Sequence, residues 1–173
     1  LYAFSTENWK RPRYEINFLF QLLSEYLKKN LDTLIKNNLK LNIFGNINRF
    51  PQKLKSSLQN AVKITSKNKG LQINLALNYG SKNEIINALN LLNQKKIPIN
   101  IKNVEKNLYT KNTPDPDILI RTGNTNRLSN FLLWQISYSE IYFVKKLWPD
   151  FNKKDFYKIL KNYENVKRNF GSI

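Results

Sequence analysis

The side chains best suited to chemistry lie in the segment that starts at Arg121. The apolar run 118–120 before it indicates a buried strand, so Arg121 comes where that strand ends. Arg127 follows after a turn, and Ser129 is placed to cap a helix over the apolar run 131–136. Guanidiniums offer a planar fork of donors, and a helix N-terminus offers unpaired N–H groups. The spacing therefore predicts an anion-binding site on this loop.

Glu140 closes the same segment as an isolated acid in a chain that has only 12 acidic residues. Two arginines and one carboxylate around one loop indicate a diphosphate held together with a divalent cation. The alternative that spacing alone leaves open is a polar loop, a capped helix and a surface acid.

A second group of functional side chains follows the apolar run 1–4, which is typical of a buried strand. In open α/β sheets, ligands bind beyond the carboxyl ends of the strands. The alternative is an ordinary turn from a strand into a helix, with Pro12 near the helix start. We favour a site because of the density of functional groups, which come from Ser5, Thr6, Glu7, Asn8, Trp9 and Arg11.

Hydrophobic periodicity predicts the elements that position these groups. Apolar residues at helical spacing predict a long helix over 14–37, and alternation predicts strands over 39–44 and 71–77. Helices are expected after Pro51, after Ser81 with a capping box to Glu84, and after Asn152 with a cap at Asp155. Strands that alternate with helices predict a single α/β domain over residues 1–173, with a mainly parallel central sheet flanked by helices.

Composition restricts the chemistry. The 173 residues include no cysteine and no histidine, which excludes a thiolate nucleophile, a disulfide and the commonest general base. The net charge of +17 invites a nucleic-acid-binding interpretation, but 23 of the 29 cations are lysines spread along the chain. Four of the six arginines fall in the two segments described above. Because bidentate phosphate recognition favours arginine, their positions are more informative than the total charge, and we expect no nucleic-acid partner.

Two of these segments resemble motifs of the cis-prenyltransferases, in particular of the bacterial undecaprenyl diphosphate synthases. Residues 1–12 resemble the motif L-Y-A-F-S-x-E-N-W-x-R-P. Residues 121–140 resemble the motif R-T-x-x-x-x-R-x-S-N-F-L-L-W-Q-x-x-Y-x-E. Asn78-Tyr79-Gly80 and the stretch 147–151 match the same family in the same order.

The resemblance implies an undecaprenyl diphosphate synthase-like α/β fold and a cytoplasmic homodimer with an apolar tunnel for the growing chain. The implied reaction adds isopentenyl diphosphate repeatedly to farnesyl diphosphate with cis geometry, using Mg²⁺, and gives a long-chain product such as undecaprenyl diphosphate. By position, Glu140 would bind Mg²⁺ and Asn8 would act where the proton is removed. The isopentenyl diphosphate group would be held by Arg121, Arg127 and Ser129, with Leu128 beside them. The substrates would also contact Ser5, Thr6, Glu7, Trp9 and Arg11.

The chain also departs from the family pattern. The family motif D-G-N-G-R-W, which supplies a magnesium-binding aspartate, is absent, and the chain has no methionine. We therefore expect a fragment that lacks its first strand-loop-helix unit and is inactive alone. A histidine common in the family is Asn126 here, and the family's C-terminal ending corresponds to Asn169-Phe170-Gly171, with Arg168 one place off. A non-catalytic partner subunit of the same fold is the alternative function.

The basic surface generates a prediction about membranes. Because anionic lipids attract clustered lysines and arginines, we expect peripheral contact with the inner face of the membrane, where a long lipid product must go. Sedimentation with vesicles should show stronger binding to anionic than to neutral lipid. Equal binding to the two would contradict this prediction.

Overall fold

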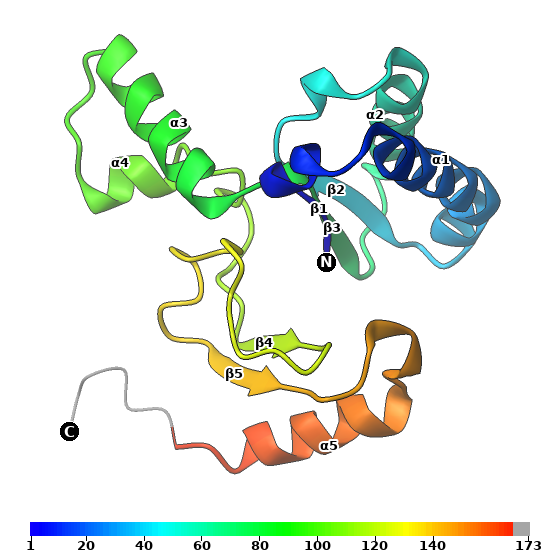
Figure 1. Cartoon of the computed structure of the whole chain (residues 1–173). Helices are drawn as coiled ribbons and strands as arrows, with labels where there is room; N and C mark the ends of the chain where they lie inside the picture. Colours follow the sequence, from blue (N-terminus) through cyan, green and yellow to red (C-terminus); the bar gives the residue numbers. More distant parts are fainter. Residues whose placement is uncertain (168–173) are drawn as a thin grey trace. The chain divides into compact units, whose positions relative to one another are not determined.

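The computed structural model describes residues 1–167, which form two compact units, the first over Leu1–Tyr109 and the second from Thr110 onward. Figure 1 shows the elements of each unit. The first unit contains β1 (Tyr2–Ser5), η1 (Thr6–Lys10), α1 (Arg13–Lys36), β2 (Lys40–Phe44), η2 (Ile47–Arg49), α2 (Gln52–Thr65), β3 (Gln72–Tyr79), α3 (Ser81–Gln94) and α4 (Ile101–Glu105). The second unit contains β4 (Ile118–Arg121), β5 (Glu140–Phe143), η3 (Trp148–Asp150) and α5 (Lys153–Glu164).

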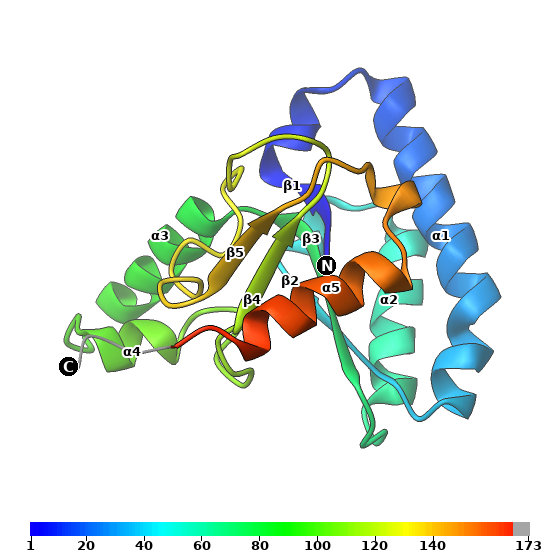
Figure 2. The ribbon, with the colours of Figure 1, turned by 90° about the horizontal axis from the view of Figure 1, so that it is seen from below.

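Each unit has its own parallel sheet. The first sheet has the order β1-β3-β2, and β3 pairs in parallel with both of its neighbours. In the second unit, β4 pairs in parallel with β5, and Figure 2 shows these two strands side by side. The predicted α/β class with parallel strands is therefore confirmed. Because neighbouring strands run the same way, the loops that follow them meet at one edge of each sheet. The single domain expected over the whole chain stays a prediction.

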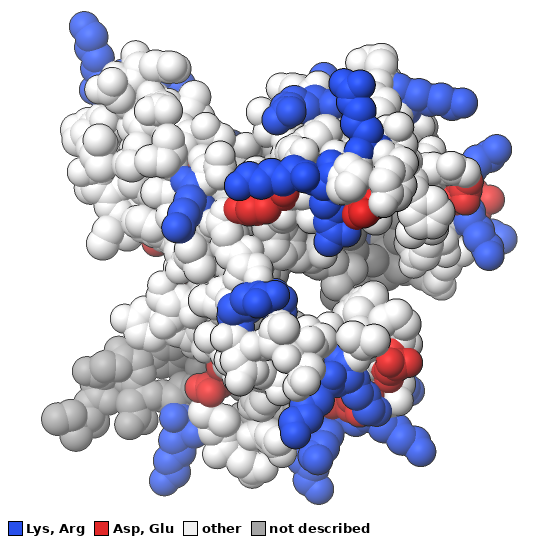
Figure 3. All heavy atoms as spheres, viewed as in Figure 1, with Lys and Arg blue, Asp and Glu red and all other residues white. Residues whose placement is uncertain are grey.

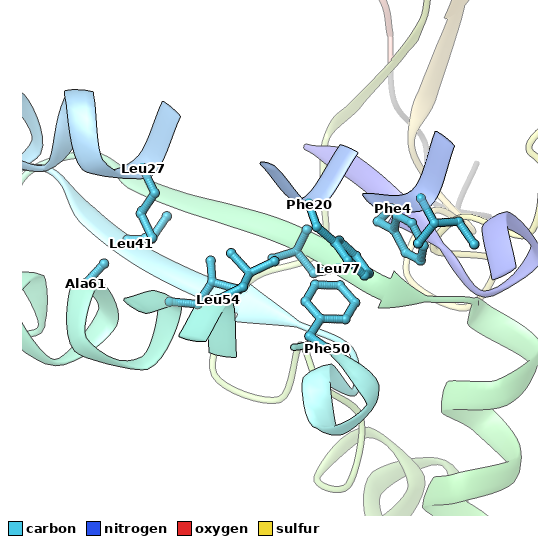
Figure 4. Packing of buried hydrophobic residues seen from close by; sticks show 10 residues of the cluster. Phe4, Phe20, Leu27, Leu41, Phe50, Leu54, Ala61 and Leu77 are labelled. Carbon is cyan, nitrogen blue, oxygen red and sulfur yellow. The ribbon is translucent and has the colours of Figure 1, made fainter. Parts of the chain in front are cut away.

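Aromatic rings form the centre of the core in the first unit. Phe4 of β1 lies 5.4 Å from Phe20 of α1 and 5.6 Å from Phe50, measured between ring centroids. Figure 4 shows these rings together, with Leu41, Leu54 and other aliphatic side chains extending the cluster between α1, α2 and the strands. Burial of this cluster is the main term that holds the sheet to its helices.

The predicted capping box at the start of α3 is wrong. Gly80 occupies the N-cap position, and Ser81 is the first helical residue and is fully buried. The Glu84 carboxylate accepts hydrogen bonds from the Tyr79 hydroxyl at 2.5 Å and from the Tyr109 backbone N–H at 2.7 Å. A buried carboxylate needs such donors, and this need outweighs the local capping pattern.

Tyr109 also responds to this environment. Burial raises the pKa of its hydroxyl, a hydrogen bond to Asn87 opposes the rise, and the nearby Glu84 charge reinforces it. The ring of Tyr109 packs edge-on against Tyr79, with 6.3 Å between centroids. These contacts attach the segment after α4 to the end of β3.

The predicted cap of the last helix is confirmed. The Asn152 side chain accepts hydrogen bonds from the N–H groups of Lys154 at 2.9 Å and Asp155 at 3.3 Å. The Asp155 carboxylate accepts in return from the Asn152 N–H at 2.9 Å and binds the Lys146 ammonium at 2.8 Å. The hydrogen bond from Lys146 is the main cause that lowers the pKa of Asp155, and the bond from Asn152 adds to it. This cap fixes where α5 begins after β5.

The surface of both units is rich in basic side chains (Figure 3). Figure 3 shows Lys and Arg side chains distributed over the visible face of each unit, with few acids between them. Within residues 1–167, no helix is both long and apolar enough to cross a lipid bilayer. The expected peripheral membrane contact stays a prediction.

The tail residues 168–171 singled out in the sequence lie outside the described residues.

Two leucines of the first unit test the core. Leu58 on α2 is completely buried, whereas Leu71 just before β3 is 70% exposed. Leu58→Ala should lower the free energy of unfolding by about 2–5 kcal/mol, because it removes buried methyl groups and leaves a cavity. Leu71→Ala, the matched control, should change it by no more than about 0.5 kcal/mol. Urea unfolding followed by far-UV circular dichroism measures both, and equal effects would contradict this description of the core.

Candidate functional site

The segment after β1 folds into the short helix η1, and Asn8 determines its shape. The Asn8 side-chain oxygen accepts a hydrogen bond from the Ser5 backbone N–H at 2.7 Å. The Asn8 carbonyl accepts from the Arg11 N–H at 3.0 Å, which closes the turn. These two bonds bring the functional side chains of residues 5–11 onto one short turn at the carboxyl edge of the sheet.

The bond to Ser5 also defines what Asn8 can do chemically. A neutral carboxamide is a poor proton acceptor, and the Asn8 oxygen already accepts a backbone hydrogen bond. The amide nitrogen carries two hydrogens that can be donated to a substrate. Half-buried Asn8 is therefore suited to orienting an oxygen-rich group by donation.

The remaining residues of this segment differ in their contacts. The Thr6 hydroxyl donates to the Glu7 carboxylate at 3.1 Å. Arg11 lies 3.5 Å from the carboxylate of Glu15, and both side chains are well exposed, so the pair contributes little to stability. Trp9 is fixed by a hydrogen bond from its indole N–H to the Asn78 side-chain oxygen at 2.8 Å. Trp9 is the most firmly held member of the predicted set.

Arg121 is the centre of the second site. Its Nε donates to the Thr125 hydroxyl at 3.1 Å, and its Nη1 donates to the Ser129 hydroxyl at 3.1 Å. The guanidinium thus spans the loop that follows β4, and the structure brings together Arg121 and Ser129 as the sequence predicted. Arg127 is exposed on the same loop, and Leu128 beside it is half-buried. The loop can present one positioned guanidinium, one exposed guanidinium and a hydroxyl to an anion.

The helix predicted over 131–136 does not form. This stretch consists of turns, because Ser129, Asn130 and Leu132 have φ angles of 49°, 61° and 47°, which lie in the left-handed region. Ser129 does not cap a helix, and its hydroxyl accepts a hydrogen bond from Arg121 instead. Helix N–H groups are therefore not part of the anion site, and the side chains must supply the donors.

Glu140 lies apart from the Arg121 cluster. In the parallel ladder, Ile118 pairs with Glu140 and Arg121 pairs with Phe143, so Arg121 and Glu140 are three positions apart. At about 3.3 Å per residue the separation is roughly 10 Å along the strands, and the alternation of side chains places them on opposite faces. The expectation that Glu140 and the arginines surround one loop is not met within this unit.

The acidic side chains of the described residues do not cluster into a metal site. Residues 1–167 contain no group of three or more acidic side chains that could hold a metal ion. Glu140 supplies a single carboxylate at the amino end of β5. The described residues therefore do not form a complete Mg²⁺ site by themselves.

Sequence reasoning missed two residues near the first segment. Arg49 in η2 places its guanidinium carbon 4.4 Å from the centre of the Trp9 ring. Asn78, which the sequence analysis matched to the family without assigning it a role, bonds to both Trp9 and the Asn46 carbonyl. Arginines are rare in this chain, and neither motif accounts for Arg49. Its rarity alone could therefore have marked Arg49 as a candidate functional residue.

Comparison with known proteins agrees with the motif resemblance. A family described as putative undecaprenyl diphosphate synthase matches residues 1–171. The isoprenyl transferase of Clostridium tetani is 46% identical over 180 residues, which cover all of this chain and 71% of the relative. The isoprenyl transferase of Rickettsia typhi is 43% identical over 173 residues, covering 99% of this chain and 76% of the relative.

Solved structures share the fold. A crystal structure of a probable undecaprenyl diphosphate synthase from Campylobacter jejuni matches with a TM-score of 0.92 and 42% identity, over 99% of this chain and 82% of that one. Lavandulyl diphosphate synthase from Lavandula x intermedia, solved with dimethylallyl diphosphate, matches with a TM-score of 0.92 and 31% identity, over 99% of this chain and 77% of that one. The chain therefore belongs to the undecaprenyl diphosphate synthase family of prenyltransferases.

Proposed function

We propose that this protein condenses isopentenyl diphosphate with an allylic diphosphate, farnesyl diphosphate, in repeated cis additions that give a long-chain polyprenyl diphosphate such as undecaprenyl diphosphate. Family membership supports prenyl transfer as the reaction. The observation that carries the proposal in the structure is the Arg121 guanidinium, which shares the loop after β4 with the Ser129 hydroxyl at 3.1 Å. Both groups can bind the oxygens of a diphosphate.

The chemistry explains why such donors are needed. In each addition, the bond between the allylic carbon and a diphosphate oxygen breaks, and diphosphate leaves with the bonding electrons. The double bond of isopentenyl diphosphate supplies the electrons for the new carbon–carbon bond, and one proton is lost to form the new double bond. Fixed cationic donors stabilise diphosphate charge most strongly in a site that excludes water.

The two segments are assigned different parts of this reaction. Arg121, Arg127 and Ser129 bind the diphosphate of isopentenyl diphosphate, so that its double bond is held in place. Asn8 lies on the η1 turn and donates from its amide nitrogen, which orients a diphosphate oxygen close to where the proton leaves. The departing diphosphate, rather than Asn8, is the better proton acceptor, because a neutral carboxamide is a very weak base.

One face of α1 is suited to the apolar part of the substrates. Ile16, Phe20 and Leu27 face the core, whereas four large side chains four residues apart are between 51% and 71% exposed. Residues four apart lie on the same face of a helix, so these four side chains form one apolar stripe. This stripe is suited to forming part of the wall of the apolar tunnel that the family resemblance implies for the growing prenyl chain. Its members are Tyr14, Phe18, Leu22 and Tyr26.

Mg²⁺ remains part of the proposal, and Glu140 is the candidate ligand within this chain. Magnesium is commonly bound by one or two carboxylates together with substrate phosphates. Since Glu140 lies on the opposite face of the β4–β5 ladder from Arg121, a complete site needs ligands besides the acids described here. When bound, the ion would supply charge neutralisation for the diphosphate.

The open edge of β1 supports the proposed upstream unit. In the three-stranded sheet, β1 pairs with β3 on one side and forms the edge on the other. An edge strand with unpaired backbone groups can accept a further parallel strand. We therefore infer that a strand-loop-helix unit precedes Tyr2 and completes the metal site and the second diphosphate site.

Arg121→Lys tests the diphosphate assignment. Lysine keeps the charge but loses the planar fork that reaches both Thr125 and Ser129. A lost charge-assisted hydrogen bond contributes roughly 1.5–3 kcal/mol, so the KM for isopentenyl diphosphate should rise about 10- to 100-fold. Steady-state kinetics of the full-length protein measures this, with Lys145→Arg as the control that exchanges the two cationic side chains at an exposed position of the same unit. An unchanged KM in Arg121→Lys would remove the residue from the site.

The proposed upstream unit predicts a difference between two forms of the protein. The full-length protein should transfer prenyl groups in a Mg²⁺-dependent reaction and sediment as a homodimer. Residues 1–173 alone should be inactive, because they lack the remaining metal ligands. Incorporation of labelled isopentenyl diphosphate into lipid, measured with and without EDTA, checks this. Prenyl transfer by residues 1–173 alone would contradict the proposed division.

A further inference from the structure

Three loops at the carboxyl edge of the first sheet are joined through Asn78. The Trp9 indole N–H, from the loop after β1, donates to the Asn78 side-chain oxygen at 2.8 Å. The Asn78 side-chain nitrogen donates to the carbonyl of Asn46, in the loop after β2, at 2.5 Å. The Asn46 N–H donates in turn to the Asn78 carbonyl at 3.4 Å. One carboxamide therefore sets the positions of Trp9 and of the loop that carries Arg49.

The backbone around Asn78 leaves this arrangement little freedom. Asn78 has a φ of 47°, in the left-handed region that asparagine tolerates better than most residues. A Cβ added to Gly45, just before Asn46, would lie 2.1 Å from the carbonyl oxygen of Leu77. The loop after β2 thus approaches the last residues of β3 at a distance that only glycine allows.

The Trp9 ring is held from its inner side by aromatic packing. Its centroid lies 5.3 Å from that of Phe4, 5.7 Å from that of Phe20 and 6.2 Å from that of Phe50. The indole N–H of Trp9 is bonded to Asn78, and its ring packs against the three phenylalanine rings. Trp9 is therefore a fixed aromatic platform at the carboxyl edge of the sheet, on which another side chain can stack.

Arg49 lies on this platform. Its guanidinium carbon is 4.4 Å from the Trp9 ring centre, and the residue is exposed to solvent. Among residues 1–167, Arg49 forms no ion pair with a carboxylate, in contrast to Arg11, which pairs with Glu15. A guanidinium over an aromatic face keeps the N–H donors at its planar edge available for an oxyanion.

A purely structural role would be to cover Trp9. Lysine or an apolar side chain could cover the Trp9 ring equally well. Covering the ring also does not require a positive charge at the carboxyl edge of the sheet, which is where parallel sheets bind their ligands. Arg49 instead brings a preoriented cation next to the η1 turn, through Trp9 of that turn.

We propose that Arg49 is a further substrate-binding residue that binds a diphosphate group, with Trp9 as its platform and Asn78 as the residue that positions both. The proposal rests on the proposed function, since the diphosphate belongs to one of the two prenyl substrates. Neither the sequence motifs nor the family resemblance pointed to Arg49.

Kinetics of the full-length protein tests the proposal and identifies the substrate. In Arg49→Gln, the KM for either isopentenyl diphosphate or the allylic diphosphate should rise about tenfold or more, with kcat changed less. Arg49→Lys should recover only part of the loss, because it restores the charge without the fork. Lys53→Gln, which removes an exposed charge from neighbouring α2, is the matched control. If Arg49→Gln raises neither KM more than Lys53→Gln does, the proposal is overturned.

A binding measurement separates failure of this inference from failure of the proposed function. Inorganic pyrophosphate is titrated into the ¹⁵N-labelled full-length protein, and the Trp9 indole N–H signal is followed after assignment with Trp9→Phe. Wild type should show a saturable shift, and Arg49→Gln should bind about tenfold more weakly, as measured by the midpoint of the titration from its own free indole signal. Asn78→Leu should move the free signal and weaken binding. A wild-type protein that binds pyrophosphate through Arg49 but lacks prenyl transfer would overturn only the proposed function. Equal pyrophosphate binding by wild type and Arg49→Gln would overturn the role of Arg49.

Discussion

The Asn78 carboxamide links the ends of all three strands of the first sheet. A parallel sheet brings the following loops to one edge, but it does not fix how they lie there. Hydrogen bonds from the Trp9 indole and to the Asn46 carbonyl fix them, and the close approach of Gly45 to Leu77 leaves no room for another arrangement. The orientation of Trp9 and the position of the Arg49 guanidinium on its face follow from these contacts.

In the second unit, different groups fix the loop that follows a parallel strand. Its loop after β4 is held by the Arg121 guanidinium, which donates to the hydroxyls of Thr125 and Ser129. The loop also bonds back to the chain after β5, where the Gly123 N–H donates to the Lys146 carbonyl at 2.8 Å. In both units, arginine lies at the carboxyl edge of parallel strands and is oriented by neutral polar or aromatic partners. Such partners orient the cation without neutralising it, which suits a group that is proposed to bind a diphosphate.

Local patterns predicted the elements with strong periodicity, because core-facing residues of a helix or strand repeat at a fixed spacing. The helix α1 and the cap at Asn152 are examples.

Local patterns failed where a residue distant in the sequence determines the local structure. The spacing Ser81 to Glu84 is typical of a capping box, but Glu84 bonds to Tyr79 and Tyr109. The run 131–136 is apolar enough for a helix, yet left-handed residues before it redirect the chain. The motifs likewise identified Arg121 and Glu140. A motif carries no information on how two strands pair, and the register of β4 and β5 places these two residues apart. The contact between Arg49 and Trp9 joins residues 40 positions apart, so no local pattern could reveal it.

We propose that arginines at the carboxyl edges of these parallel strands bind the diphosphates of the prenyl substrates. A crystal structure of the full-length protein with isopentenyl diphosphate and an unreactive allylic diphosphate analogue would show whether they do. We expect diphosphate oxygens within about 3 Å of the guanidinium nitrogens of Arg121 and of the Ser129 hydroxyl, with a second diphosphate on Arg49 or near Asn8. Diphosphates bound by lysines elsewhere, with Arg121 still bonded only to Thr125 and Ser129, would contradict this proposal.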